Sequence, residues 1–250
     1  MPRQFDVPEQ VIQDILDKKL PLSAYSPYME AIHNKHVIGV NMAFMIGDWI
    51  DMVFWGDKKW YFNNRGAMAK FPGLKVTCHP SFDDQRYEKE HIKCVAKDNS
   101  HPTGISSDPK RASWNSNSGA AAISIAANMG AIKIILVGFD MKLGADQKQH
   151  WHSEYGTANR KDVQGHKLPF ARHLQGFRQI AIDARKRGIT IINACPDSEI
   201  KEFPKMSVKE VLEGASIPKV SVNTERNLGL DKERERRRQL RLQRRKLENR

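Results

Sequence analysis

Residues 115–140 read NSNSGAAAISIAANMGAIKIILVGFD and carry the clearest structural pattern in the chain. Ser118 and Gly119 predict the start of a helix, and its Ala-rich run to Met129 would let it lie close to a sheet. Gly130 suits the left-handed residue that ends many helices. The continuous apolar run 134–137 then predicts a strand covered on both faces. The segment is therefore expected to form a loop, a helix, a tight turn, a buried strand and a second loop.

Polar residues gather at two points of this segment, at the start of the helix and at the end of the strand. Asn117, Ser118 and Gly119 occupy the first point, and Asp140 follows the second. In open parallel sheets both points lie at the edge that binds ligands, because strand ends and helix N-termini meet there. We therefore expect a ligand site at this edge.

The rest of the chain repeats the alternation of strand and helix. Several predicted strands close on Asn or Asp, which favours a mostly parallel, Rossmann-like α/β sheet flanked by helices. The expected organisation is an N-terminal helix and turn-rich segment (1–36), an α/β domain (37–213), a linker (214–230) and a basic helical tail (231–250). Strands are predicted at 37–41, 52–55, 74–78, 92–95 and 189–193, with helices at 7–19, 170–184 and 207–212.

Composition limits the class of protein. The 250 residues are 40% hydrophobic and 28% charged, as expected of a soluble globular chain. No apolar run approaches the roughly 20 residues that span a bilayer, so no membrane span is predicted. The three cysteines are widely spaced and the N-terminus has no apolar signal core, which together predict a reduced, cytoplasmic location.

The positive charge is concentrated near the C-terminus. Residues 231–250 hold ten Lys or Arg and four Asp or Glu, a net charge of +6, which is half of the +12 carried by the chain. Such a run can contact nucleic acid or an acidic protein, and it can equally be a solvated helical tail.

The motifs taken in order resemble the sialyltransferase-like Rossmann-type family. This group includes bacterial α-2,3-sialyltransferases, proteins like 6-hydroxymethyl-dihydropterin pyrophosphokinase, and phage-encoded members, which this chain resembles in particular. The likeness covers residues 37–213 and rests on VIGVN (37–41), the Gly56-Asp57 step, SNSGAAA (116–122), GAIKIILVGFDM (130–141) and IINACPDS (191–198).

The resemblance implies a cytidine nucleotide sugar (a CMP-sugar donor) lying across the carboxyl edge of the sheet, with no metal required. Asn41 and the Ser118-Gly119 pair would contact the nucleotide, and Asp140 would lie near the ribose and base. A histidine of the following loop, His152 or else His150, would be the general base. One departure is clear: this chain has no strand and no Gly-x-Gly-Pro-Ser phosphate loop before Val37.

Each residue also has a structural interpretation. Asn41 would contact a base or ribose, or cap its strand in an Asx turn. Asp57 would hold a ribose hydroxyl or a metal, or cap the next helix. Asn117, Ser118 and Gly119 suit an anion at a helix N-terminus, although plain capping by Ser118 explains them equally.

The two histidines leave three interpretations open. His150 and His152 have the pKa range of a general base at neutral pH. They could instead ligate a metal together with Asp140, or lie in an exposed loop.

Three functions follow from these observations. The first is a glycosyltransferase-like protein that binds a nucleotide or nucleotide sugar and transfers a glycosyl group to a hydroxyl. The second is a pterin pyrophosphokinase-like enzyme, which would need Mg²⁺ near carboxylates such as Asp57 and Asp140. The third is a non-catalytic phage morphogenesis or nucleic-acid accessory protein that acts through residues 231–250.

Overall fold

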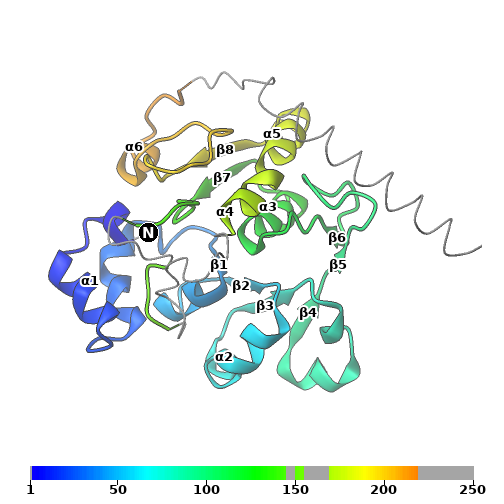
Figure 1. Cartoon of the computed structure of the whole chain (residues 1–250), viewed down its shortest axis with the longest axis horizontal. Coiled ribbons are helices and arrows are strands. Elements are labelled where there is room, and N and C mark those ends of the chain that lie inside the picture. The colour runs from blue at the N-terminus through cyan, green and yellow to red at the C-terminus, as the bar shows by residue number, and fades with distance from the viewer. Residues whose placement is uncertain (1, 145–149, 155–168, 219–250) are drawn as a thin grey trace, which may run out of the picture. The chain divides into compact units, whose positions relative to one another are not determined.

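Parallel strands connected by helices form the central sheet, as the alternating pattern predicts. The computed structural model describes residues 2–144, 150–154 and 169–218 (Figure 1). The basic tail, most of the predicted linker and part of the loop around the histidines lie outside the described residues. No helix in the described ranges is long and apolar enough to cross a bilayer.

A four-stranded parallel sheet is built from β1 (Ile38–Val40), β2 (Met52–Trp55), β3 (Leu74–Thr77) and β4 (Ile92–Cys94), in that order. Val53, Phe54 and Trp55 are fully buried in β2, because helices cover both faces of this central strand. The prediction of a parallel α/β sheet flanked by helices is thus confirmed.

Two further strand pairs stand apart from this sheet. β5 (Ala96–Lys97) pairs in parallel with β6 (Arg111–Ala112), so the predicted loop 97–116 has a short strand at each end. β7 (Lys133–Leu136) pairs in parallel with β8 (Thr190–Asn193). Within the described ranges no strand hydrogen bonds join β7 and β8 to β1.

The helix α3 (Ser118–Asn128) connects the four-stranded sheet and the β7–β8 pair by packing against both. Ala120 belongs to the apolar cluster that includes Leu136 of β7, and its neighbour Ala121 belongs to the cluster of Met52 and Phe54. Both alanines are fully buried. The small side chains predicted from the sequence therefore let one helix contact two strand layers at once.

The N-terminal segment is helical and packs on the sheet. Within residues 2–36 the structure has no strand, and Phe5, Ile15 and Tyr25 share one apolar cluster with Val53 and Trp55. The elements here are η1 (Pro2–Phe5), α1 (Glu9–Leu16) and η2 (Leu22–Ile32).

The remaining helices cover the sheet or fill its connections. α2 (Lys58–Lys70) follows β2 and buries Trp60, Tyr61 and Met68, and short 3-10 turns complete the connections. These other elements are η3 (Asn41–Ile46), η4 (Pro80–Phe82), η5 (Gln85–Glu90), α4 (Phe170–His173), η6 (Leu174–Gly176), α5 (Phe177–Lys186) and α6 (Val208–Leu212).

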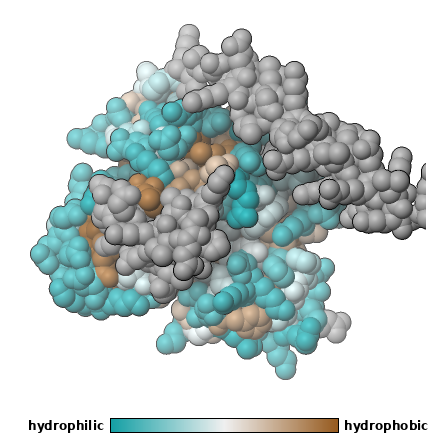
Figure 2. All heavy atoms as spheres, in the orientation of Figure 1, coloured by the Kyte–Doolittle hydropathy of each residue, from teal (hydrophilic) through white to brown (hydrophobic). Residues whose placement is uncertain are grey.

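Two local predictions were wrong. The helix expected over 170–184 is divided by η6, where Gly176 packs so closely on Asn115 that a β-carbon would lie 2.7 Å from its side chain. The strand β7 was expected to be covered on both faces but is covered on one only, because Ile135 is 40% exposed. The helix α6 packs over Ile192 of the neighbouring strand β8 instead. Small hydrophobic areas interrupt the mostly hydrophilic coloured surface in Figure 2.

The close packing of α3 gives a direct test. Ala121→Leu forces extra methyl groups between α3 and β2, so the free energy of unfolding should fall by about 1–3 kcal/mol. Ala126→Leu, at a partly exposed position of the same helix, should cost less. Urea unfolding of both variants measures this, and equal losses would contradict a two-sided packing role for α3.

Candidate functional site

Loops at the carboxyl ends of β1, β2, β3 and β7 carry most of the polar residues predicted to form a site. Asn41 follows β1, Asp57 follows β2 and Asp140 comes four residues after β7. His79, which was not predicted as a site residue, follows β3. The carboxyl ends of parallel strands meet at one edge, so this edge is the candidate site.

Asn117, rather than Ser118, caps helix α3. Its Oδ1 accepts hydrogen bonds from the backbone N–H groups of Gly119 (2.8 Å) and Ala120 (3.4 Å). The backbone N–H of Ser118 has no hydrogen-bond partner in the described part of the chain. An N–H at a helix N-terminus is a donor suited to an anion or a hydroxyl oxygen.

The start of α3 lies directly against the loop that carries Asp140. A β-carbon on Gly119 would approach the ring of Phe139 to 2.7 Å, so only glycine allows this contact. Asn117 Nδ2 donates to Met141 Sδ at 3.8 Å. The predicted residues Asn117, Ser118 and Gly119 therefore lie against the loop that carries the predicted Asp140; we call these four residues the α3 cleft.

Cys195 holds the same loop in place. Its Sγ accepts hydrogen bonds from the backbone N–H groups of Gly138 (3.1 Å) and Phe139 (3.2 Å). Burial, with a smaller contribution from Asp140, raises the pKa of this thiol to about 11. Cys195 is therefore a buried structural thiol rather than a nucleophile.

Left-handed backbone at non-glycine residues recurs beside the α3 cleft. Asn41, Asn115, Ser116 and Met141 have φ angles of 52°, 54°, 55° and 53°. Asn115 is held by hydrogen bonds between its side chain and the backbone of Gly104 and Ser113. Such conformations cost energy and cluster at ligand sites, although three others occur elsewhere, at Asp6, Lys18 and His91.

Asp57 serves first as a helix cap. Its Oδ1 accepts from the backbone N–H groups of Lys59 (2.7 Å) and Trp60 (3.2 Å), which begins α2. No hydrogen bond or ion pair of the described residues links Asp57 to Asn41 or Asp140.

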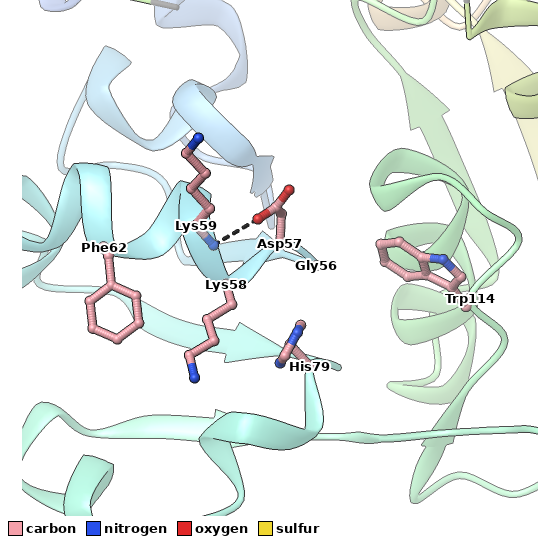
Figure 3. Close-up of a pocket in the computed structure, with 7 residues that line it drawn as sticks. All are labelled: Gly56, Asp57, Lys58, Lys59, Phe62, His79 and Trp114. Carbon is pink, nitrogen blue, oxygen red and sulfur yellow. Dashed lines mark hydrogen bonds between the residues drawn. The ribbon is translucent and has the colours of Figure 1, made fainter.

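Asp57 also lines an open pocket of about 700 Å³ at the carboxyl ends of β2 and β3. In Figure 3, Trp114 reaches the pocket from the segment before α3, and the α2 residues lie opposite. The lining residues are Gly56, Asp57, Lys58, Lys59, Phe62, His79 and Trp114. We call this the β2–β3 pocket.

The two predicted histidines lie next to each other with their rings stacked, at 5.6 Å between centroids. Between them, Trp151 packs edge-on against Tyr25 and joins the cluster that includes Val137, just after β7. The histidine segment is thereby anchored to the N-terminal segment.

His152 is poorly placed to accept a proton. It is 3% exposed, and its Nδ1 accepts a hydrogen bond from the backbone N–H of Glu154 (3.2 Å), so its own proton lies on Nε2. Burial, followed by the neighbouring His150, lowers the pKa of His152 to about 3. Burial also lowers the pKa of His150, which is more accessible. This geometry favours His150 over His152 as the proton acceptor.

Sequence reasoning missed most of the β2–β3 pocket. Lys58, Lys59 and Phe62 belong to the helix α2, and His79 follows a short strand. Only the folded register of β2 and β3 brings these positions together. Gly56 and Asp57 are the lining residues that the sequence analysis singled out.

Comparison with protein-family models, with characterised proteins and with solved structures gives no match to this chain. The interpretation of the site therefore rests on its own geometry and on the motif resemblance.

The depressed pKa of His152 predicts an acid-dependent stability. The unfolded histidine takes up a proton near pH 6.5, whereas the folded one does so near pH 3, so the free energy of unfolding should fall as the pH drops between these values. One such group contributes at most about 1.4 kcal/mol per pH unit. Urea unfolding of His152→Gln should show a shallower fall.

His36→Gln is the matched control, because that side chain is fully exposed. It should keep the wild-type slope between pH 6.5 and 3. A His152→Gln slope equal to that of the wild type would show that this imidazole is not held neutral by burial.

Proposed function

We propose that this protein binds a nucleotide sugar at the carboxyl edge of its sheet and transfers the glycosyl group to a hydroxyl acceptor, as the sialyltransferase-like resemblance implies. One observation carries the proposal. The N-terminus of α3, with the Ser118 N–H available, packs against the loop that presents Asp140 beyond β7. A helix N-terminus facing a strand-end carboxylate suits a ligand with both an anionic and a hydroxyl part.

Each group of the α3 cleft would contact a different part of the nucleotide. The Ser118 N–H and the dipole of α3 would stabilise negative charge on the nucleotide phosphate. Asp140 would accept a hydrogen bond from a ribose hydroxyl or from an amino group of the base. Asn41, in its left-handed turn after β1, would offer both a donor and an acceptor to the same ligand.

Transfer requires one main proton movement. His150 would take the proton from the acceptor hydroxyl as its oxygen attacks the anomeric carbon of the sugar. The bond from that carbon to the phosphate oxygen breaks, and the nucleotide leaves with the electron pair. His152, whose proton lies on Nε2, would keep the neighbouring imidazole in place by stacking.

The site differs from that of the sialyltransferase-like family in its N-terminal segment. Residues 2–36 supply no strand and no Gly-rich phosphate loop, and Gln4 Oε1 accepts a hydrogen bond from Gly138 N at 3.1 Å. Phosphate binding would therefore depend on the N-terminus of α3 and on basic side chains.

The other two functions have less support. A Mg²⁺-dependent pyrophosphokinase would use carboxylates such as Asp57 and Asp140, and Asp57 is already engaged as the cap of α2. Residues 231–250, which would carry the accessory role, lie outside the described residues, so no structural observation favours that role.

Nucleotide binding tests the proposal. Isothermal titration with CMP should give saturable binding, and Asp140→Ala should weaken binding at the α3 cleft by about tenfold or more, since a hydrogen bond to a charged group contributes about 1.5–3 kcal/mol. Titration with UMP shows whether the base is discriminated.

Asp48→Ala is the charge-matched control, because Asp48 is exposed and lies in the connection between β1 and β2. It should leave CMP affinity unchanged. The proposal fails if CMP does not bind, or if Asp140→Ala and Asp48→Ala behave alike.

A further inference from the structure

The β2–β3 pocket carries more positive than negative charge, with two lysines and one carboxylate, Asp57, in its lining. Lys58 and Lys59 line it, and Lys97 Nζ lies 4.4 Å from the centroid of the Trp114 ring. Within the described ranges none of the three lysines forms an ion pair. The one carboxylate in the lining, Asp57, already caps α2.

His79 adds a hydrogen-bond donor to this positive surface. Its Nδ1 accepts a hydrogen bond from the backbone N–H of Ser81 (3.2 Å), so in the neutral ring the proton lies on Nε2. Burial, then Lys97 and Lys58, lower the pKa of His79, which keeps the ring neutral at pH 7. Figure 3 shows the ring among the lining side chains, below Asp57.

Two aromatic side chains lie at opposite ends of the pocket in the same view (Figure 3). Phe62 is 43% exposed, and Lys58 Nζ lies 5.9 Å from the centroid of its ring. The Trp114 ring lies on the backbone of Gly56, where a β-carbon would come within 2.0 Å of the indole. The orientation of Trp114 therefore depends on glycine at position 56.

We propose that the β2–β3 pocket binds a nucleotide unit, with its phosphate held by Lys58 and His79 Nε2–H and its base placed against Trp114; Lys59, whose ammonium points to the other side of α2 in Figure 3, adds positive charge to the site. Basic side chains interleaved with aromatic platforms are the usual means of binding nucleotides in single strands. The same chemistry fits a free nucleotide or one unit of a single-stranded nucleic acid. This site is separate from the α3 cleft and does not depend on glycosyl transfer.

The chemistry of the pocket argues against simpler ligands. An inorganic phosphate would contact the lysines but neither aromatic ring, and a neutral sugar would offer the lysines no negative charge. A nucleotide satisfies the two kinds of group together, because it joins an anion to a flat ring.

Titration of a lysine pair tests this site. Lys58→Ala/Lys59→Ala should weaken CMP binding at the β2–β3 pocket at least tenfold. Lys35→Ala/Lys70→Ala removes the same charge from exposed positions away from the pocket and should leave affinity unchanged. Equal effects from both pairs, or none from either, would overturn the proposal.

The two sites are distinguishable in one experiment. If both exist, CMP binds in two events, of which Asp140→Ala removes one and Lys58→Ala/Lys59→Ala removes the other. If the wild-type protein shows the Asp140-dependent event but no lysine-dependent event, the β2–β3 pocket is refuted and the proposed function stands. If it shows the lysine-dependent event but no Asp140-dependent event, the proposed function is refuted and the β2–β3 pocket stands.

Comparing the affinities of inorganic phosphate, CMP and an oligothymidylate identifies the class of ligand. Inorganic phosphate should bind more weakly than CMP, and a match between the two would refute the role of Trp114. A ten-residue oligothymidylate that binds much more tightly than CMP, in a lysine-dependent and salt-sensitive manner, identifies a nucleic-acid strand as the ligand. Comparable affinities identify a free nucleotide.

A second variant keeps the test independent of charge. Gly56→Ala would push the Trp114 ring from its position and should weaken lysine-dependent CMP binding at least tenfold. Gly66→Ala, in the same segment of chain, meets nothing within 4 Å and should bind CMP as the wild type does. Unchanged binding in Gly56→Ala would show that the indole does not support the base.

Discussion

The close contact of α3 with two strand layers is the constraint on which the rest of the structure depends. In the described ranges no strand hydrogen bonds connect β1 with β7, so the four-stranded sheet and the β7–β8 pair are held together by side-chain packing. Ala120 faces one cluster and Ala121 the other, and both are fully buried. A bulkier helix would separate the two layers and with them the two sides of the candidate site.

This packing also determines where chemistry can occur. Because α3 lies against both layers, its N-terminus meets the loop that follows β7, and Gly119 permits the contact with Phe139. Trp114, three residues before the cap Asn117, reaches instead toward the ends of β2 and β3. One connection thus contributes to both the α3 cleft and the β2–β3 pocket.

Local signals in the sequence predicted local structure well. Gly130 has the left-handed conformation expected after a helix, with φ of 96°, and Ser207 and Glu210 form a capping box at the start of the helix predicted over 207–212. These features depend on neighbouring residues only. The exposure of Ile135 could not be predicted in the same way, because it depends on which helix covers which face of a strand.

The candidate site was predictable only in part, for the same reason. Asn117, Ser118, Gly119 and Asp140 lie within one continuous segment, so their proximity follows from a single helix and strand. The β2–β3 pocket combines residues from three distant segments, and its lysines have no distinguishing pattern along the chain. The preference for His150 over His152 rests on the burial of His152 and on a backbone hydrogen bond from Glu154, and composition reveals neither.

Ligands are expected to bind at the carboxyl edge of the parallel strands. A crystal structure of the protein soaked with CMP would locate the ligand. We expect CMP against the N-terminus of α3 and Asp140, in the β2–β3 pocket, or at both. CMP bound at the amino ends of the strands, or no bound CMP at a concentration that saturates binding in solution, would contradict it.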